Sequence, residues 1–119
     1  MDFEKLDVWR LSTELSIEVY RAMKSLRDFG FKDQITRSSL SIPSNIAEGM
    51  TRNGPREKLQ FLSFAKGSCS ELRTQIYIGQ RIDYIDQKIA EEWIDRTKRV
   101  ASMISGLSNK IKQDKGLTS

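Results

Sequence analysis

The sequence predicts an all-α protein, an antiparallel up-and-down four-helix bundle, and three observations lead to this fold class. Apolar residues recur at spacings of three and four in four successive stretches of the 119-residue chain, which is the pattern of helices with one buried face. Short polar segments containing glycine, proline or aspartate separate these stretches, and short connections favour antiparallel neighbours. No segment repeats at a period of about 20–50 residues, which excludes a solenoid. We therefore expect one domain over residues 1–119.

The first helix is expected over residues 6–26. Its apolar stripe consists of Val8, Leu11, Leu15, Val19, Ala22 and Leu26. Acidic residues lie at its start, where they complement the helix dipole, namely Asp2, Glu4 and Asp7. Gly30 follows between two phenylalanines, and it is suited to a left-handed conformation where the helical segment breaks.

The second helix, expected over residues 32–48, is unusual because it contains four serines and a proline near its middle. Pro43 cannot donate a hydrogen bond to the carbonyl of Ser39, so we expect a kink near Pro43. A row of polar residues at helical spacing, here called the polar ladder, consists of Gln34, Arg37, Ser41, Asn45 and Glu48. This ladder is either a solvent-facing stripe or a polar seam against another helix or another subunit.

The third helix is expected over residues 55–81, because Pro55 suits the first helical position. Its stripe consists of Leu62, Ala65, Cys69, Leu72, Ile76 and Gly79. Gly67 costs about 1 kcal/mol of helix propensity relative to alanine, and close approach of another helix at Gly67 and Ser68 is the expected compensation. Together with Glu71, these two residues are assigned to the same polar seam or interface. Cys69 is expected to be an inert core thiol.

The fourth helix is expected to begin after Asp86, which is a suitable N-cap, and to run to about residue 111. Its stripe has the clearest periodicity in the chain: Ile89, Trp93, Thr97, Val100, Ile104, Leu107 and Ile111. The tail is polar, and we expect it to fray from about residue 112.

The composition excludes several classes of function. Histidine is absent and Cys69 is the only cysteine, which removes the commonest general base, the histidine-activated nucleophiles and most zinc ligands. We therefore expect no catalytic residues, no metal site and no cofactor. No apolar run approaches ~18 residues and the N-terminus lacks the pattern of a signal peptide, so no membrane segment is expected. The single thiol fits the reducing cytoplasm.

The net charge of +4 is unevenly distributed. Residues 49–81 carry six basic side chains against two acidic ones, whereas residues 1–48 carry seven against eight. A local basic excess can attract phosphate, although it is equally compatible with a solvated helix face. The candidate nucleic-acid contacts are Arg52, Arg56, Lys58, Lys66, Arg73, Arg81, Lys98, Arg99, Lys110 and Lys112.

Three segments together resemble a known family: LDVW at residues 6–9, QITRSSLSIPSNIAEG at 34–49 and EKLQFLSFAKGSCSEL at 57–72. They are similar to the bacterial four helix bundle protein family, which includes proteins encoded in intervening sequences of large-subunit ribosomal RNA genes. Accessory variability proteins of diversity-generating retroelements are more distant members. The resemblance covers roughly residues 3–110 and implies an up-and-down bundle that forms a homopentameric ring or barrel.

For the retroelement relatives, the resemblance also implies a basic surface that binds nucleic acid and a reverse transcriptase. This chain has Thr36 before Arg37 where the family often has two arginines, which weakens a phosphate-binding role for the second helix. We expect a non-catalytic homo-oligomer that binds structured RNA or other nucleic acid through basic surfaces. The alternative is a protein-interaction scaffold or accessory subunit without nucleic-acid contact. A third hypothesis is an acid–base set of Arg37, Glu48 and Glu71.

Overall fold

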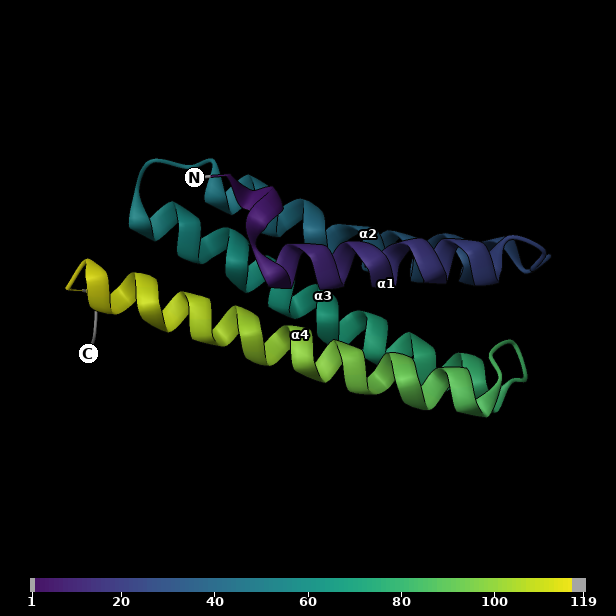
Figure 1. The fold of residues 1–119 in the computed structure, drawn as a ribbon. Coiled ribbons are helices and arrows are strands. Elements are labelled where there is room, and N and C mark those ends of the chain that lie inside the picture. Colours follow the sequence, from purple (N-terminus) through teal and green to yellow (C-terminus); the bar gives the residue numbers. More distant parts are fainter. Residues whose placement is uncertain (1, 117–119) are drawn as a thin grey trace.

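The computed structural model describes residues 2–116 and contains four long helices that run alternately up and down (Figure 1). A short 3₁₀ turn, η1, covers Phe3–Lys5, and the α-helices are α1 (Asp7–Met23), α2 (Phe29–Met50), α3 (Pro55–Arg81) and α4 (Gln87–Asp114). The bundle is elongated, with extents of 47 × 22 × 22 Å. The predicted four-helix bundle is therefore confirmed. None of the described helices is long and apolar enough to cross a membrane.

The break between the first two helices differs from the prediction. The helix α1 ends at Met23, three residues early, and α2 begins at Phe29, three residues before the predicted start. Asp28 is the N-cap of α2, and its side chain accepts a hydrogen bond from the backbone N–H of Phe31 at 3.1 Å. Gly30 therefore lies in the first turn of α2, and its predicted left-handed conformation is wrong. The capping carboxylate satisfies the first turn, so this glycine is not needed to end a helix.

The ends of α3 and α4 follow the sequence more closely. The bounds of α3 are those predicted, and Asp86 caps α4 by accepting from the backbone N–H groups of Lys88 and Ile89. The helix α4 continues to Asp114, so the expected fraying from about residue 112 is wrong over its last helical residues. The predicted frayed tail otherwise includes residues 117–119, which lie outside the described part of the chain.

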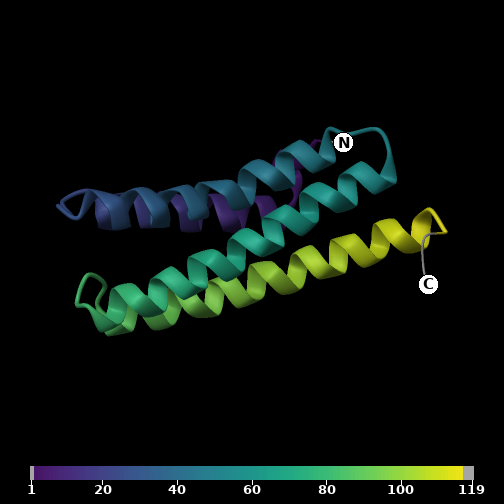
Figure 2. The same cartoon turned by 180° about the vertical axis from the view of Figure 1, so that it is seen from behind.

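Pro43 is buried within α2, and the helix remains continuous through it. Figure 2 shows α2 running along α1 over its first half and changing direction beyond its middle, as the prediction of a kink requires. The buried hydroxyl groups of Ser16 and Ser39 lie 3.1 Å apart and join α1 to α2. Small hydroxyl side chains therefore let these two helices pack closely without leaving this polar pair unsatisfied.

The predicted apolar stripes form one core, but in two places the buried residue is the one that follows the predicted residue in the sequence. Ala22 is exposed and Met23 is buried in α1, while Ile89 is 42 % exposed and Ala90 is buried in α4. At the α3–α4 turn, Ile85 is buried against Gly79 and fills the core there. Because Ile85 occupies this part of the core, the small side chain of Ala90 is sufficient on the inner side of the first turn of α4.

The close approach expected at Gly67 is wrong within the described bundle, because Gly67 is exposed and a Cβ there would meet open space. Two other glycines make such contacts. A Cβ at Gly49 would lie 3.0 Å from the Cβ of Phe61, and a Cβ at Gly79 would lie 2.7 Å from the Cδ1 of Ile85. Tight packing of α2 on α3 therefore depends on Gly49, near one end of the bundle.

Candidate nucleic-acid interface

The polar ladder of α2 divides into a packed part and an exposed part. The hydroxyl of Ser68 donates to that of Ser41 at 2.9 Å, which links α3 to α2. The side-chain amide of Asn45 donates to both the carbonyl and the hydroxyl of Ser41, at 2.8 and 2.9 Å. These three residues form a polar seam between two helices of one chain, as one of the two interpretations predicted.

The other members predicted for the seam or interface lie on the surface, namely Gln34, Arg37, Glu48, Gly67 and Glu71. Arg37 is paired with Asp33 and its side chain is 76 % exposed, while Glu48 is paired with Arg52. Each charge is thus matched by a neighbour one helical turn away. The acid–base set of Arg37, Glu48 and Glu71 gains no support from these pairings, because two of its three members are paired with other residues.

Several of the ten candidate basic residues gather at one end of the bundle. The α2–α3 loop and the end of α4 lie at this end in Figure 1. Arg52 belongs to this loop, Arg56 and Lys58 to the first turn of α3, and Lys58 shares a groove with Lys110 of α4. Arg52 pairs with Glu48 and lies 4.8 Å from the ring centre of Phe61.

The ammonium group of Lys58 donates to the carbonyl of Met50 at 3.2 Å. Lys58 and Arg52 therefore brace the loop, whereas Arg56, Lys110 and Lys112 are exposed.

The remaining candidates lie farther along the bundle. Arg81 is exposed at the opposite end of α3. Arg99 lines two grooves between α1 and α4, and both include Glu14 as well as another arginine, Arg96 or Arg10. Arg73 is half-buried and donates to the hydroxyl of Thr97 at 2.9 Å, which joins α3 to α4. Lys98 is exposed on α4.

Arg96 was not among the candidates predicted from the sequence. It pairs with Glu18 of α1 and lies 3.7 Å from Glu92 of its own helix. Its charge is thus already compensated by two carboxylates, and Arg96 stabilises the packing of α1 on α4. Only the tertiary arrangement could reveal this role, since Arg96 and Glu18 are far apart in the chain.

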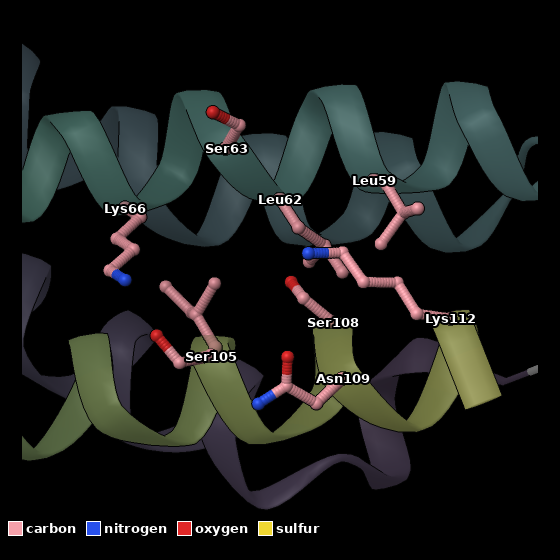
Figure 3. Close-up of a pocket in the computed structure, with 9 residues that line it drawn as sticks. Leu59, Leu62, Ser63, Lys66, Ser105, Ser108, Asn109 and Lys112 are labelled. Atoms are coloured by element: carbon pink, nitrogen blue, oxygen red, sulfur yellow. The ribbon is translucent and has the colours of Figure 1, made fainter. Parts of the chain in front are cut away.

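A pocket between α3 and α4 brings two of the predicted lysines together (Figure 3). It has a volume of about 250 Å³ and is lined by Leu59, Leu62, Ser63, Lys66, Ile104, Ser105, Ser108, Asn109 and Lys112. Figure 3 shows the ammonium groups of Lys66 and Lys112 lying in the space between the helices, and the hydroxyl of Ser108 pointing from α4 toward α3. The hydroxyl of Ser63 points away from α4. None of the described residues that line this pocket is acidic.

The sequence carried an unused signal for this pocket. Ser105, Ser108 and Lys112 follow at steps of three and four on α4, adjacent to the apolar stripe that was recognised. Residues 96–113 include five basic side chains and no acidic one, although residues 82–119 as a whole are nearly neutral. The acidic residues at 83–95 and 114 balance this local basic excess when the charge is summed over residues 82–119.

Cys69 is buried among apolar side chains of α3, as predicted. Burial raises the pKa of its thiol to about 12, because the thiolate would lose its hydration, while the nearby cations Arg73 and Lys66 act weakly in the opposite direction. The thiol therefore stays protonated at neutral pH and lacks the character of a reactive nucleophile.

Comparisons with known proteins bear on both family and fold. Residues 4–106 match the family described as 23S rRNA-intervening sequence protein. One solved structure is that of a protein of unknown function from the S23 ribosomal protein family of Bacteroides thetaiotaomicron VPI-5482, determined at 1.70 Å resolution. It superimposes with a TM-score of 0.79 at 20 % identity, covering 85 % of this chain and 97 % of the other, and it shows a shared fold. No curated protein matches the sequence.

Proposed function

Because the chain belongs to the family of 23S rRNA-intervening sequence proteins, we propose that it is a non-catalytic protein that binds structured RNA through the basic surface shared by α3 and α4. The family description names an RNA, and the surface has the charge that an RNA backbone requires. Contacts of this kind go to phosphates and carry little information about base sequence.

The observation that carries the proposal is the carboxylate-free length of α4. Residues 96–113 have no aspartate or glutamate, and this helix packs on α3 where α3 contributes Lys66 and Arg73. Between residues 59 and 77 of α3, the only acidic residue is Glu71, which is exposed. With a single carboxylate on these two stretches, the lysines attract phosphate with little local repulsion.

We further propose that the protein acts in the cytoplasm as a homo-oligomer, with the pentamer implied by the family resemblance as the expected state. A ring repeats each basic surface once per subunit, so weak phosphate contacts add through multivalency. Native mass spectrometry of the protein alone and with RNA tests this assembly. A monomer under both conditions contradicts it.

Binding of a structured RNA hairpin to the wild-type protein at rising salt concentration tests the proposed function. Each neutralised phosphate contributes about −0.7 to −0.9 to the slope of log K against log salt, so several phosphate contacts give a slope of several units. Lys98→Glu should weaken binding more than Lys88→Glu, the matched control. Lys88 is also exposed on α4, but it lies beside Asp86 at the opposite end. Absence of binding at low salt, or a slope of zero, excludes the proposal.

A scaffold function is the second candidate, and a groove between α1 and α2 favours it. The groove has a volume of about 340 Å³ and includes Ile17, Tyr20, Leu40 and Pro43. The first three are 43 %, 44 % and 48 % exposed, and such apolar clusters are typical of protein contacts. If Leu40→Lys changes the native mass or removes a bound protein while RNA binding is absent in the wild type, the scaffold function is favoured.

A further inference from the structure

We infer that the pocket between α3 and α4 binds one phosphate group of a nucleic acid together with part of the sugar that carries it. The inference rests on the proposed function and deepens it, because it names the chemical group that the basic surface holds and the residues that hold it. The pocket is called the α3–α4 pocket below.

The charges of the α3–α4 pocket select an anion. Lys66 comes from α3 and Lys112 from α4, and Figure 3 shows both ammonium groups in the space between the two helices. No carboxylate of the described residues lines this space, so the two like charges are not compensated within the pocket. An anion that enters between them is attracted by both lysines and relieves their mutual repulsion. Each ammonium group also offers three hydrogen-bond donors.

Neutral donors on α4 complete the polar side of the pocket. Ser108 and Asn109 follow Ser105 by three and four residues on one side of the helix, and all three line the pocket. Figure 3 shows the hydroxyl of Ser108 pointing from α4 toward α3. Phosphate oxygens accept hydrogen bonds from hydroxyl, amide and ammonium groups alike, and this set therefore matches a tetrahedral anion better than a planar apolar ligand.

The floor of the pocket accounts for the sugar. Leu59 lines the pocket and is half-buried, whereas Leu62 and Ile104 beneath it are fully buried. Leu59 therefore offers the apolar surface for the carbon atoms of a ribose. The volume of about 250 Å³ is below the range of about 300–1,000 Å³ typical of pockets for drug-sized ligands. The space thus suits a fragment of a polymer, such as one sugar–phosphate unit, more than a complete small-molecule ligand.

The groove between α1 and α4 provides the contrast. It is similar in size, about 320 Å³, but it is lined by Glu14, Glu18 and Glu92. It also includes Arg96 and Arg99, and Arg96 already pairs with Glu18. A phosphate would meet three carboxylates against two arginines there, so this groove attracts phosphate less than the α3–α4 pocket does.

The test compares lysine variants that make the same change in net charge. Lys66→Gln and Lys112→Gln should each weaken binding of a structured RNA hairpin about tenfold or more, since each removes a charge-assisted contact. Lys88→Gln is the matched control and should weaken binding less than about threefold by loss of general charge. Lys88 is also exposed on α4, but it lies beside Asp86 at the opposite end of the helix.

A second measurement reports the location directly. Inorganic phosphate titrated into the ¹⁵N-labelled wild-type protein should shift the backbone amide signals of Lys66, Ser105 and Ser108, and it should compete with RNA. Hairpins with a 5′-phosphate and with a 5′-hydroxyl distinguish the source of the phosphate. Tighter binding of the first assigns the pocket to a chain end, and equal binding assigns it to an internal phosphodiester.

The outcomes separate this inference from the proposed function. Equal losses for the variants at Lys66, Lys112 and Lys88, with no phosphate-dependent shifts at the pocket, overturn the α3–α4 pocket and leave RNA binding in place. Phosphate-dependent shifts at the pocket without RNA binding retain the pocket and overturn the proposed function. Losses confined to Lys66 and Lys112, with matching shifts, support both.

Discussion

Replacing Gly49 and Gly67 by alanine should change the stability of the bundle in different directions. Both are helical glycines, one in α2 and the other in α3. A Cβ at Gly67 would meet open space, whereas a Cβ at Gly49 would lie 3.0 Å from the Cβ of Phe61 and 3.2 Å from the carbonyl oxygen of Lys58. Neither of these atoms can rotate away, because one is the first atom of a side chain and the other belongs to the backbone. The same added methyl group therefore has room in α3 and not in α2.

The magnitudes follow from two terms. Replacing a helical glycine by alanine stabilises a helix by about 0.8–1 kcal/mol, and this term is similar for both variants. Gly67→Ala should therefore raise the free energy of unfolding by about 1 kcal/mol. At Gly49, overpacking costs about 1–3 kcal/mol and opposes that gain, so the net effect ranges from almost none to a loss of about 2 kcal/mol. The difference between the variants, about 1–3 kcal/mol, isolates the packing term.

Thermal unfolding followed by circular dichroism measures this difference. For a chain of 119 residues, 1 kcal/mol corresponds to a shift in Tm of about 4 °C, so the two variants should differ by about 4–12 °C. Scans at two protein concentrations separate effects on folding from effects on association. Equal Tm values would refute the close approach at Gly49. A lower Tm for Gly67→Ala that depends on concentration would show instead that Gly67 lies in a contact between subunits.

Three further predictions concern the seam, the buried thiol and a helix cap. Ser41→Ala and Ser68→Ala, combined in a double-mutant cycle by urea unfolding, should show a coupling of about 0.5–1.5 kcal/mol, and additivity would exclude their hydrogen bond. Cys69 should react with a thiol reagent at pH 8 only as fast as the protein opens, and fast labelling of the folded protein would contradict its burial. Since folding raises the pKa of this thiol from 9.0 to about 12, the unfolded state loses its proton first, and stability should fall as pH rises above about 9. The backbone N–H of Phe31 donates to the carboxylate of Asp28 and lowers its pKa. The stabilisation of the fold by this charged N-cap should therefore be present above the ordinary pKa of 3.8 and disappear on further acidification. Asp28→Ala should abolish this pH-dependent stabilisation, as measured by acid unfolding.

The element bounds were predictable where the signals are local. Pro55 and Asp86 act on the backbone within one turn of themselves, so the starts of α3 and α4 could be read from neighbouring residues. The start of α2 differs from the prediction because two local signals compete there. Gly30 suggests the end of a helical segment, whereas Asp28, an aspartate before a helical stretch, is a capping signal, and the structure follows Asp28.

The candidate site was predictable only in its composition. The sequence identified ten basic residues, including Lys66 and Lys112, as candidates for phosphate contact. It could not show that Arg52 lies over Phe61, that Lys58 donates to the carbonyl of Met50 or that Arg99 shares a groove with Glu14. These facts depend on neighbours in other helices, and one-dimensional spacing does not specify such neighbours.

The sequence by itself determined that the chain forms four amphipathic helices with one apolar core, because hydrophobic spacing repeats every turn and each short connection reverses direction. Only the tertiary structure decided which glycine admits a neighbouring helix and which lysines share a pocket. The physical reason is that a helix presents several faces at once, and the rotation of each helix against its neighbours determines which face is covered. That rotation places Gly49 against Phe61 and Lys66 in the same pocket as Lys112, and it leaves Gly67 exposed.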